Sequence, residues 1–183
     1  MRKIHAGLFI SLDGVVEAPE TWHFPYFDDQ MGAAVGEMMG GNDTMLLGRQ
    51  TYQEFAGYWP NADPNEPITA QMNETPKLVA SRTLDTVEWQ NSSLLEGDAA
   101  EALRAIKAGP GGDIGISGSP TLVRSLLDAG VLDELRLLVH PIVVGHGKRL
   151  FPDGTSTVPL TLTASTVFDS GVLYLTYRRA DAA

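Results

Sequence analysis

The stretch Ile116-Ser117-Gly118-Ser119-Pro120-Thr121-Leu122 decides the fold of this chain. It predicts an apolar strand that ends in a turn of small residues, followed by a helix whose first residue is Pro120. Ser119 is suited to cap this helix, and Gly130 is suited to end it. The exposed start of such a helix points free backbone N–H groups outward, which makes it a binding site for phosphate. A capped surface helix that binds nothing is the alternative.

A second segment of the same kind lies earlier in the chain. The apolar run Thr44-Met45-Leu46-Leu47 leads directly into Gly48-Arg49-Gln50-Thr51-Tyr52, which again predicts a buried strand and a helix that starts at a glycine. Arg49 supplies a cation beside this turn, unless it pairs with Glu54 on its own helix. Two such turns indicate a dinucleotide that is bound at two points.

The composition restricts the class of protein. At 183 residues, the chain is long enough for one domain, residues 1–183, with a sizeable core. It has no cysteine, and its four histidines lack zinc-type spacing, so neither disulfides nor a metal site is expected. The net charge of −10 argues against a nucleic-acid partner. We interpret residues 3–11 as a first strand rather than a signal peptide or membrane span, and expect a cytoplasmic protein.

Apolar periodicity and turn residues predict alternating strands and helices, and therefore an α/β sheet with mostly parallel strands. Three strands close the chain without helices between them, which implies an antiparallel edge. The proline-rich connection 60–76 is expected to be irregular, with one turn of helix. Strands are expected at 3–11, 44–47, 78–80, 87–89, 113–116, 134–139, 160–167 and 172–179, and helices begin near Asp28, Gly48, Asp98 and Pro120.

Several catalytic motifs fail at the places where the sequence comes near to them. The segment Gly115–Ser119 lacks the last glycine of a nucleophile elbow. Gly147-Lys148-Arg149 lacks the hydroxyl residue of a phosphate loop, and Gly109–Ile114 departs from the G-x-G-x-x-G pattern. Phosphate binding without a nucleophile, metal or phosphotransfer loop favours a redox cofactor that brings its own chemistry.

Taken together, these segments resemble the dihydrofolate reductase superfamily. Within it, the chain is similar to the branch that contains the reductase domain of the bifunctional riboflavin-pathway deaminase-reductase. The resemblance extends from residue 3 to residue 178 and rests on the order of its motifs. These motifs are Ser11–Gly14, Leu47–Tyr52, Ser81-Arg82, Ser117–Leu122, Val131–Leu135, His140–Gly145 and Gly147–Phe151.

The resemblance implies a three-layer α/β fold with a central mixed sheet of eight strands, flanking helices, and NADPH bound across the strand ends. The helix start at residues 48–51 resembles the family's helix start that lies under the cofactor phosphates. The turn at 118–122 resembles the family's turn that binds the pyrophosphate. Positions 81–82 resemble those that hold the adenosine 2′-phosphate, and 13–14 lie in a loop near the nicotinamide. The implied cofactor-binding residues are Asp13, Gly14, Gly48, Arg49, Thr51, Ser81, Arg82, Gly118, Ser119, Pro120, Thr121 and Leu122.

The substrate end departs from dihydrofolate reductase itself. There, an acid shortly after a Trp-x-x-Pro segment contacts the pterin ring, whereas here Phe27 stands at that place and Asp28 follows one step later. One residue turns a helix by about 100°, which puts folate reduction in doubt. Trp22, Phe24 and Phe27 are candidates for stacking on a flat heterocycle, with core packing as the alternative. Asp28 is the candidate proton donor; the alternatives are a helix N-terminal charge at Asp28 and solvent as the proton source.

The hypothesis is an NADPH-dependent reductase that transfers hydride to a small planar heterocycle or a related C=N or C=O compound, similar to 5-amino-6-(5-phosphoribosylamino)uracil reductase. The alternatives are a non-catalytic nucleotide- or flavin-binding protein on the same fold and dihydrofolate reductase proper. A further alternative is the riboflavin-pathway reductase itself, with Lys148 and Arg149 as phosphate contacts. The resemblance also implies a homodimer that pairs through the sheet edge. No nucleic acid, membrane or metal is expected as a partner.

Overall fold

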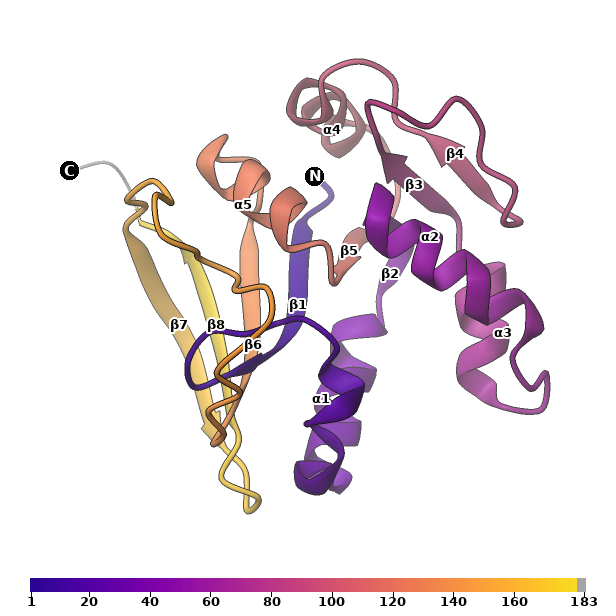
Figure 1. Cartoon of the computed structure of the whole chain (residues 1–183). Helices are drawn as coiled ribbons and strands as arrows, with labels where there is room; N and C mark the ends of the chain where they lie inside the picture. Colours follow the sequence, from indigo (N-terminus) through magenta and orange to yellow (C-terminus); the bar gives the residue numbers. More distant parts are fainter. Residues whose placement is uncertain (181–183) are drawn as a thin grey trace.

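A central sheet of eight strands organises the molecule (Figure 1). The computed structural model describes residues 1–180. The strand order is β4-β3-β2-β5-β1-β6-β8-β7. Pairing is parallel from β4 to β6, whereas β8 is antiparallel to both β6 and β7. The predicted α/β fold with a mixed eight-stranded sheet is therefore confirmed. The strands are β1 (Ile4–Ser11), β2 (Asn42–Gly48), β3 (Lys77–Ala80), β4 (Ser92–Leu94), β5 (Asp113–Ser117), β6 (Glu134–His140), β7 (Leu160–Val167) and β8 (Leu173–Arg179).

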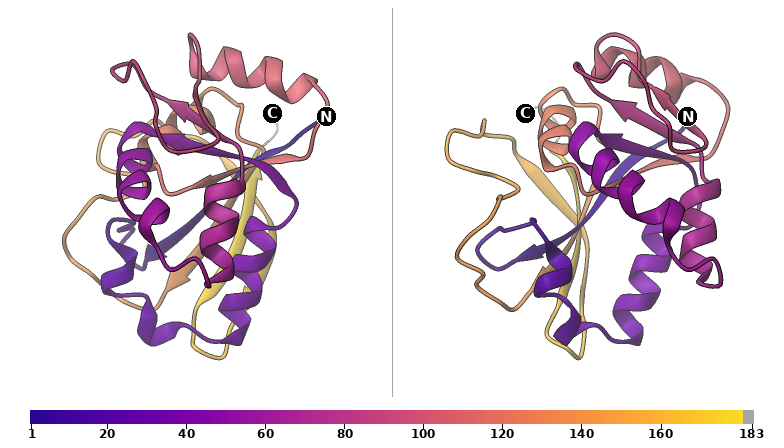
Figure 2. Two further views of the ribbon diagram at one scale, coloured as in Figure 1. Left: turned by 90° about the vertical axis from the view of Figure 1, so that its right-hand side faces the viewer. Right: turned by 45° about the vertical axis from the view of Figure 1, so that its right-hand side comes forward.

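Helices cover both faces of the sheet and give the predicted three layers (Figure 2). Apolar residues of α4 and α5 pack on one face, and those of α1, α2 and α3 on the other. Within residues 1–180, no helix has the length and apolar character needed to cross a membrane. The helices are α1 (Asp29–Met39), α2 (Arg49–Tyr58), α3 (Pro67–Glu74), α4 (Ala99–Ala108) and α5 (Pro120–Asp128), with short 3-10 turns at Pro19–Thr21, Phe24–Tyr26 and Trp59–Asn61.

Strand β1 lies in the middle of the core, and its side chains alternate between the two faces. Its even-numbered residues from Ile4 to Ile10 are buried in the cluster under α4 and α5. On the other face, Phe9 packs with the apolar residues of α1. A Cβ on Gly7 would lie 2.7 Å from the Sδ atom of Met38. Glycine at this position therefore lets α1 approach the sheet closely, which sets the distance between the two layers.

Two local predictions are wrong. Residues 87–89 do not form a strand, because the backbone N–H groups of Glu88 and Trp89 donate to the Tyr52 hydroxyl at 2.9 and 3.1 Å instead of to a neighbouring strand. The strand in this region is β4, at Ser92–Leu94. The connection 60–76 contains the two-turn helix α3 rather than one helical turn. Pro67 is its first residue, where the missing N–H group is harmless, so this proline starts a helix instead of preventing one.

Candidate functional site

The candidate site lies at the carboxyl ends of the parallel strands. In sheets of this kind, ligands bind outside the carboxyl ends of the strands, where the connections to the following helices leave a crevice. The segments that are predicted to bind the cofactor come immediately after β1, β2, β3 and β5 in the sequence. Since these strands are parallel neighbours in the sheet, the four segments share one edge. The fold thus brings together positions that are far apart in the sequence.

The two predicted phosphate-binding turns are in direct contact. The Gly48 N–H donates to the Ser119 hydroxyl at 2.8 Å, and the Ser119 N–H donates to the Thr51 hydroxyl at 3.1 Å. The two hydroxyl oxygens are themselves 2.9 Å apart and hydrogen-bonded. Gly118 has a positive φ of 65°, and a Cβ there would lie 3.3 Å from Thr51. Glycine at this position therefore lets the two turns approach each other.

Ser119 does not cap α5 with its side chain, so that prediction is wrong. Its hydroxyl is turned toward Gly48 and Thr51, and no side-chain cap is formed. Its backbone has φ 56° and ψ 54°, a left-handed conformation that non-glycine residues rarely adopt. The residue is buried. The serine thus links two turns instead of satisfying the N–H groups of its own helix.

The starts of α2 and α5 differ from those of α1 and α4. Asp28 caps α1 by accepting from the Met31 N–H at 2.8 Å, and Asp98 caps α4 by accepting from the Glu101 N–H at 3.0 Å. Neither α2 nor α5 has a side-chain cap or an acidic residue in its first turn. Helix α3 also lacks a side-chain cap but has Glu66 at its cap position. Helices α2 and α5 therefore place no carboxylate beside their own first N–H groups. The positive end of each helix dipole is not neutralised by a residue of that helix.

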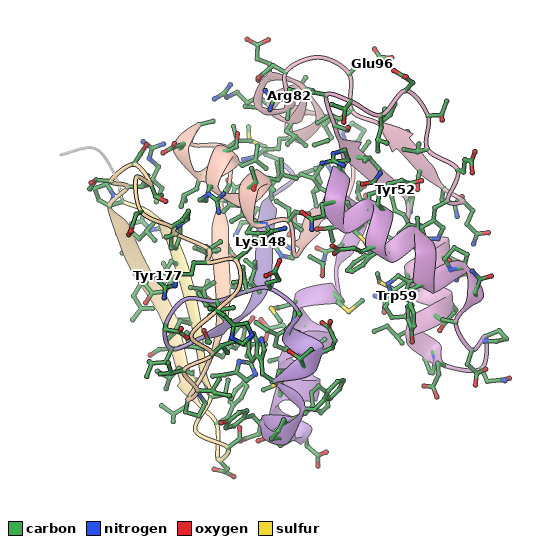
Figure 3. All side chains as sticks on the ribbon, viewed as in Figure 1. Tyr52, Trp59, Arg82, Glu96, Lys148 and Tyr177 are labelled. Carbon is green, nitrogen blue, oxygen red and sulfur yellow. The ribbon has the colours of Figure 1, made fainter. Side chains whose placement is uncertain are left out.

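Two cations lie beside the start of α2. The Arg49 guanidinium donates to Gln53 at 3.0 Å, and it is Gln50, not Arg49, that pairs with Glu54. The Lys148 ammonium donates to the Gln50 side chain at 2.8 Å and lies 3.5 Å from a Glu17 carboxylate oxygen. Lys148 therefore reaches from the segment after β6 to the first turn of α2 (Figure 3). These two cations can contact an anionic group, although the carboxylates of Glu17 and Glu54 lie in the same region.

Ser81 and Arg82 follow β3 at the same edge. The Ser81 hydroxyl accepts from the N–H groups of Thr83 and Leu84 at 3.2 and 3.0 Å, which fixes the turn. Arg82 is exposed and lies well away from Lys148 in Figure 3. The two cations can therefore contact only separate parts of a long ligand.

Asp13 connects two loops through hydrogen bonds. Its carboxylate accepts from the Ser11 hydroxyl at 2.6 Å and from the N–H groups of Val144 and Gly145 at 3.0 and 2.9 Å. These bonds, that of Ser11 first, lower the pKa of Asp13 to about 2. Gly14 follows with φ 86°, in the turn that the pair predicts. Asp13 thus positions the loop after β1 against the segment after β6, and its oxygens are occupied.

The aromatic segment 22–28 is divided between core and surface. Trp22 is buried, donates from Nε1 to the Glu17 carbonyl at 3.1 Å and packs edge-on against His140. Phe24 and Phe27 are exposed. The Met31 N–H bond lowers the pKa of Asp28, which favours the carboxylate and disfavours its use as a proton donor. Of the predicted substrate contacts, only the two phenylalanines present their rings to solvent.

Two shallow hollows lie beside α2 and the segment between β3 and β4. Their volumes are about 490 and 280 Å³, and Pro60, Glu88 and Trp89 line both. Trp89 and Gln90 precede the start of β4, so the smaller hollow lies toward the amino end of that strand. The larger hollow is also lined by Tyr52 and Gln53 of α2 and by Leu84 and Thr86, which follow β3, so it borders the strand-end edge of the candidate site. No cluster of metal-binding side chains occurs in the described part of the chain. The convergence of strand ends and helix starts therefore defines the candidate site better than surface shape does.

Comparison with known proteins identifies the family and agrees with the fold. The family model described as RibD C-terminal domain matches residues 2–174, so the chain belongs to this family. The uncharacterized protein YyaP of Bacillus subtilis (strain 168) is 30% identical in an alignment of 182 positions that covers 96% of this chain and 94% of that protein. A Shewanella sp. PV-4 protein, provisionally assigned to riboflavin biosynthesis, matches with a TM-score of 0.75 and 20% identity over 98% of this chain and 99% of its own. Dihydrofolate reductase from Enterococcus faecalis, complexed with NADP(H) and RAB-propyl, matches with a TM-score of 0.64 and 20% identity over 98% and 97% of the two chains.

Proposed function

We propose that this RibD C-terminal domain protein is an NADPH-dependent reductase of a small planar heterocycle or a related C=N or C=O compound. The observation that carries the proposal is the paired, uncapped starts of α2 and α5, joined through Gly48, Thr51 and Ser119. Two adjacent helix N-termini without carboxylates suit the two phosphates of a dinucleotide. The membership in a reductase-type family and the fold shared with an NADP(H)-complexed protein support the same reading.

Different residues of the candidate site are proposed to bind different parts of the cofactor. Free N–H groups at the start of α2 and in the turn from Gly118 to Leu122 would hold the pyrophosphate, with Arg49 and Lys148 adding charge. Arg82, exposed at the end of β3, is the cation proposed for the 2′-phosphate. The bound cofactor supplies the hydride, and the protein positions the acceptor and excludes water. Because Asp28 is a helix cap with a lowered pKa, we assign the proton to solvent.

A titration tests the cofactor. NADPH and NADH are added separately to the whole chain, and binding is followed by tryptophan fluorescence and thermal shift. Replacing Arg49 by methionine removes a charge-assisted contact that contributes about 1.5–3 kcal/mol, so the Kd for NADPH should rise at least about tenfold. Arg104→Met is the matched control, because Arg104 is an exposed helical arginine that donates to the Ala129 carbonyl on another part of the surface.

Three outcomes are informative. A change within about twofold for Arg49→Met would show that Arg49 does not contact a cofactor phosphate, given the size of such contacts. No response of the natural chain to either nucleotide would end the reductase proposal. Tight NADPH binding without oxidation by any heterocyclic, C=N or C=O acceptor would identify the protein as a non-catalytic nucleotide binder on this fold.

The proposal includes a homodimer in the cytoplasm. Strand β7 lies at the edge of the sheet, and its eight residues, LTLTASTV, contain no charge. Leu162 and Val167 on this strand are 49% and 70% exposed. A long uncharged edge strand is suited to pairing with a second chain. Analytical ultracentrifugation tests this, since Leu162→Lys should convert a dimer to a monomer. The cysteine-free composition agrees with a reducing compartment.

A further inference from the structure

His23 lies among three phenylalanine rings, and we call Phe9, His23, Phe24 and Phe27 the His23 cluster. The imidazole stacks on Phe9, with ring centroids 4.6 Å apart. The centroids of Phe24 and Phe27 lie 4.2 and 6.0 Å from it. His23 is 7% exposed, whereas Phe24 and Phe27 are 63% and 50% exposed. The cluster thus presents two aromatic rings to solvent beside one almost buried imidazole.

The two nitrogens of His23 have different surroundings. Nδ1 is buried and has no hydrogen-bond partner among residues 1–180. Nε2 is not enclosed in this way and bonds to no described residue, so it is the nitrogen that solvent reaches. A buried donor without an acceptor is costly, so a neutral imidazole in this position carries its proton on Nε2. The cluster therefore directs one N–H group toward the surface.

The His23 imidazole is neutral at physiological pH. Burial is the main cause of its lowered pKa, and His140, whose ring centroid is 6.1 Å away, lowers it further. Glu20 is the charged group that opposes this shift. The rings that contact His23 are Phe9 of β1, His140 of β6, and Phe24 and Phe27 of its own segment. Among the described residues, the charged group that acts on His23 is the Glu20 carboxylate, so the N–H group is suited to a neutral acceptor rather than to an anion.

The cluster borders the candidate site. Phe9 lies on β1 two residues before that strand ends at Ser11, and residues 23–27 belong to the connection that follows β1. This is the strand-end edge that carries the uncapped helix starts of α2 and α5. Apolar rings that converge with one polar group near such an edge are typical of small-molecule sites.

We propose that His23 is the polar contact of the substrate site. Its Nε2–H donates a hydrogen bond to a ring carbonyl oxygen of a planar heteroaromatic molecule that stacks on Phe24 and Phe27. Stacking uses the faces of the exposed rings, and the hydrogen bond fixes the orientation of the ligand. This inference rests on the proposed function, because it names the residue that selects the acceptor of that reductase.

The test uses lumazine, a fluorescent pteridine with two ring carbonyls, titrated into the whole chain at pH 7.5. His23→Phe keeps an aromatic ring but removes the donor, and should weaken lumazine binding about tenfold, the usual effect of losing one hydrogen bond. His23→Gln offers an amide N–H in its place and should bind within about threefold of the natural chain. His146→Phe, which changes an exposed histidine outside the cluster, should bind lumazine as the natural chain does. The Kd for NADPH should be the same in all four proteins.

Imidazole ¹⁵N NMR supplies a readout that a merely structural role would not change. The spectrum of His23 should show the Nε2–H tautomer, and its resonances should shift when lumazine is added. The Nδ1–H tautomer, or an unchanged lumazine Kd in His23→Phe, would overturn the inference.

The remaining outcomes separate the inference from the proposed function. Binding of NADPH but not of lumazine by the natural chain would refute the role of His23 and leave the reductase proposal standing. Binding of lumazine but not of NADPH would refute the reductase proposal and leave His23 as a contact of a heteroaromatic ligand. If Phe24→Ser converts a dimer to a monomer, a second copy of the chain covers the cluster, and the inference is wrong.

Discussion

Replacing Ser119 by alanine tests whether the two turns of the candidate site act as one unit. The serine hydroxyl accepts from the Gly48 N–H at 2.8 Å and donates to the Thr51 hydroxyl at 2.9 Å, in a buried position. Alanine leaves the Gly48 N–H without its acceptor, which costs about 1–3 kcal/mol of stability. Because both turns then lose their common support, NADPH affinity should fall together with the free energy of unfolding.

Replacing Ser119 by glycine separates the effect of losing the hydroxyl from the effect of the left-handed backbone conformation. Serine and alanine both carry the cost of a left-handed conformation at φ 56°, and glycine does not. Ser119→Gly loses the same hydrogen bonds but should be about 1 kcal/mol more stable than Ser119→Ala. The order of stability should therefore be natural chain, glycine variant, alanine variant.

Urea unfolding followed by tryptophan fluorescence measures these differences. Ser92→Ala is the control, because the buried Ser92 hydroxyl has no hydrogen-bond partner among the described residues, so its removal leaves no polar group unpaired and should not lower stability. The reasoning is refuted if Ser119→Ala lies within about 0.5 kcal/mol of the natural chain, well under the cost of an unpaired buried N–H. It is also refuted if the glycine variant is less stable than the alanine variant.

Two further predictions concern Lys77 and Asp28. Burial lowers the pKa of Lys77 from 10.5 to about 8, so between these pH values the folded state binds fewer protons than the unfolded state, and stability should rise with pH. The rise should be at most about 3 kcal/mol, and urea unfolding should show it in the natural chain but not in Lys77→Met. Asp28→Asn should keep both the α1 cap and the reductase activity, since asparagine caps helices as well as aspartate does. A folded Asp28→Asn variant without activity in a steady-state NADPH oxidation assay would restore Asp28 as the proton donor.

The elements that the sequence predicts well are those with local start and stop signals. Asp98 caps α4 as expected, and Gly41 and Gly130 adopt positive φ just after α1 and α5. Residues 87–89 have the composition of a strand, but their N–H groups are taken by Tyr52, which is 36 and 37 residues away in the sequence. A partner at that separation overrides local preference, and nothing near Val87 signals it.

The candidate site was predictable as a set of turns but not as a connected structure. The positions of Gly48 and Gly118 after their strands follow from local patterns, and the parallel sheet brings them to one edge. The bond between Ser119 and Thr51 spans 68 residues, and a serine before a proline suggests a cap rather than a link. The burial of Trp22 could not be predicted from the sequence either, because an aromatic residue in a loop can lie in the core or on the surface.

The position of Asp28 has a consequence for the ligand. In dihydrofolate reductase, which this chain resembles, an acid near this place contacts the pterin ring, and a carboxylate can only accept hydrogen bonds. Here the acid caps α1, and the proposed polar contact in segment 22–28 is the neutral His23, which donates. A donor selects ring carbonyls, whereas a carboxylate selects ring amino groups. Lumazine, with two carbonyls, should therefore bind more tightly than 2,4-diaminopteridine in parallel fluorescence titrations. The opposite order would show that a carboxylate, not His23, faces the ligand.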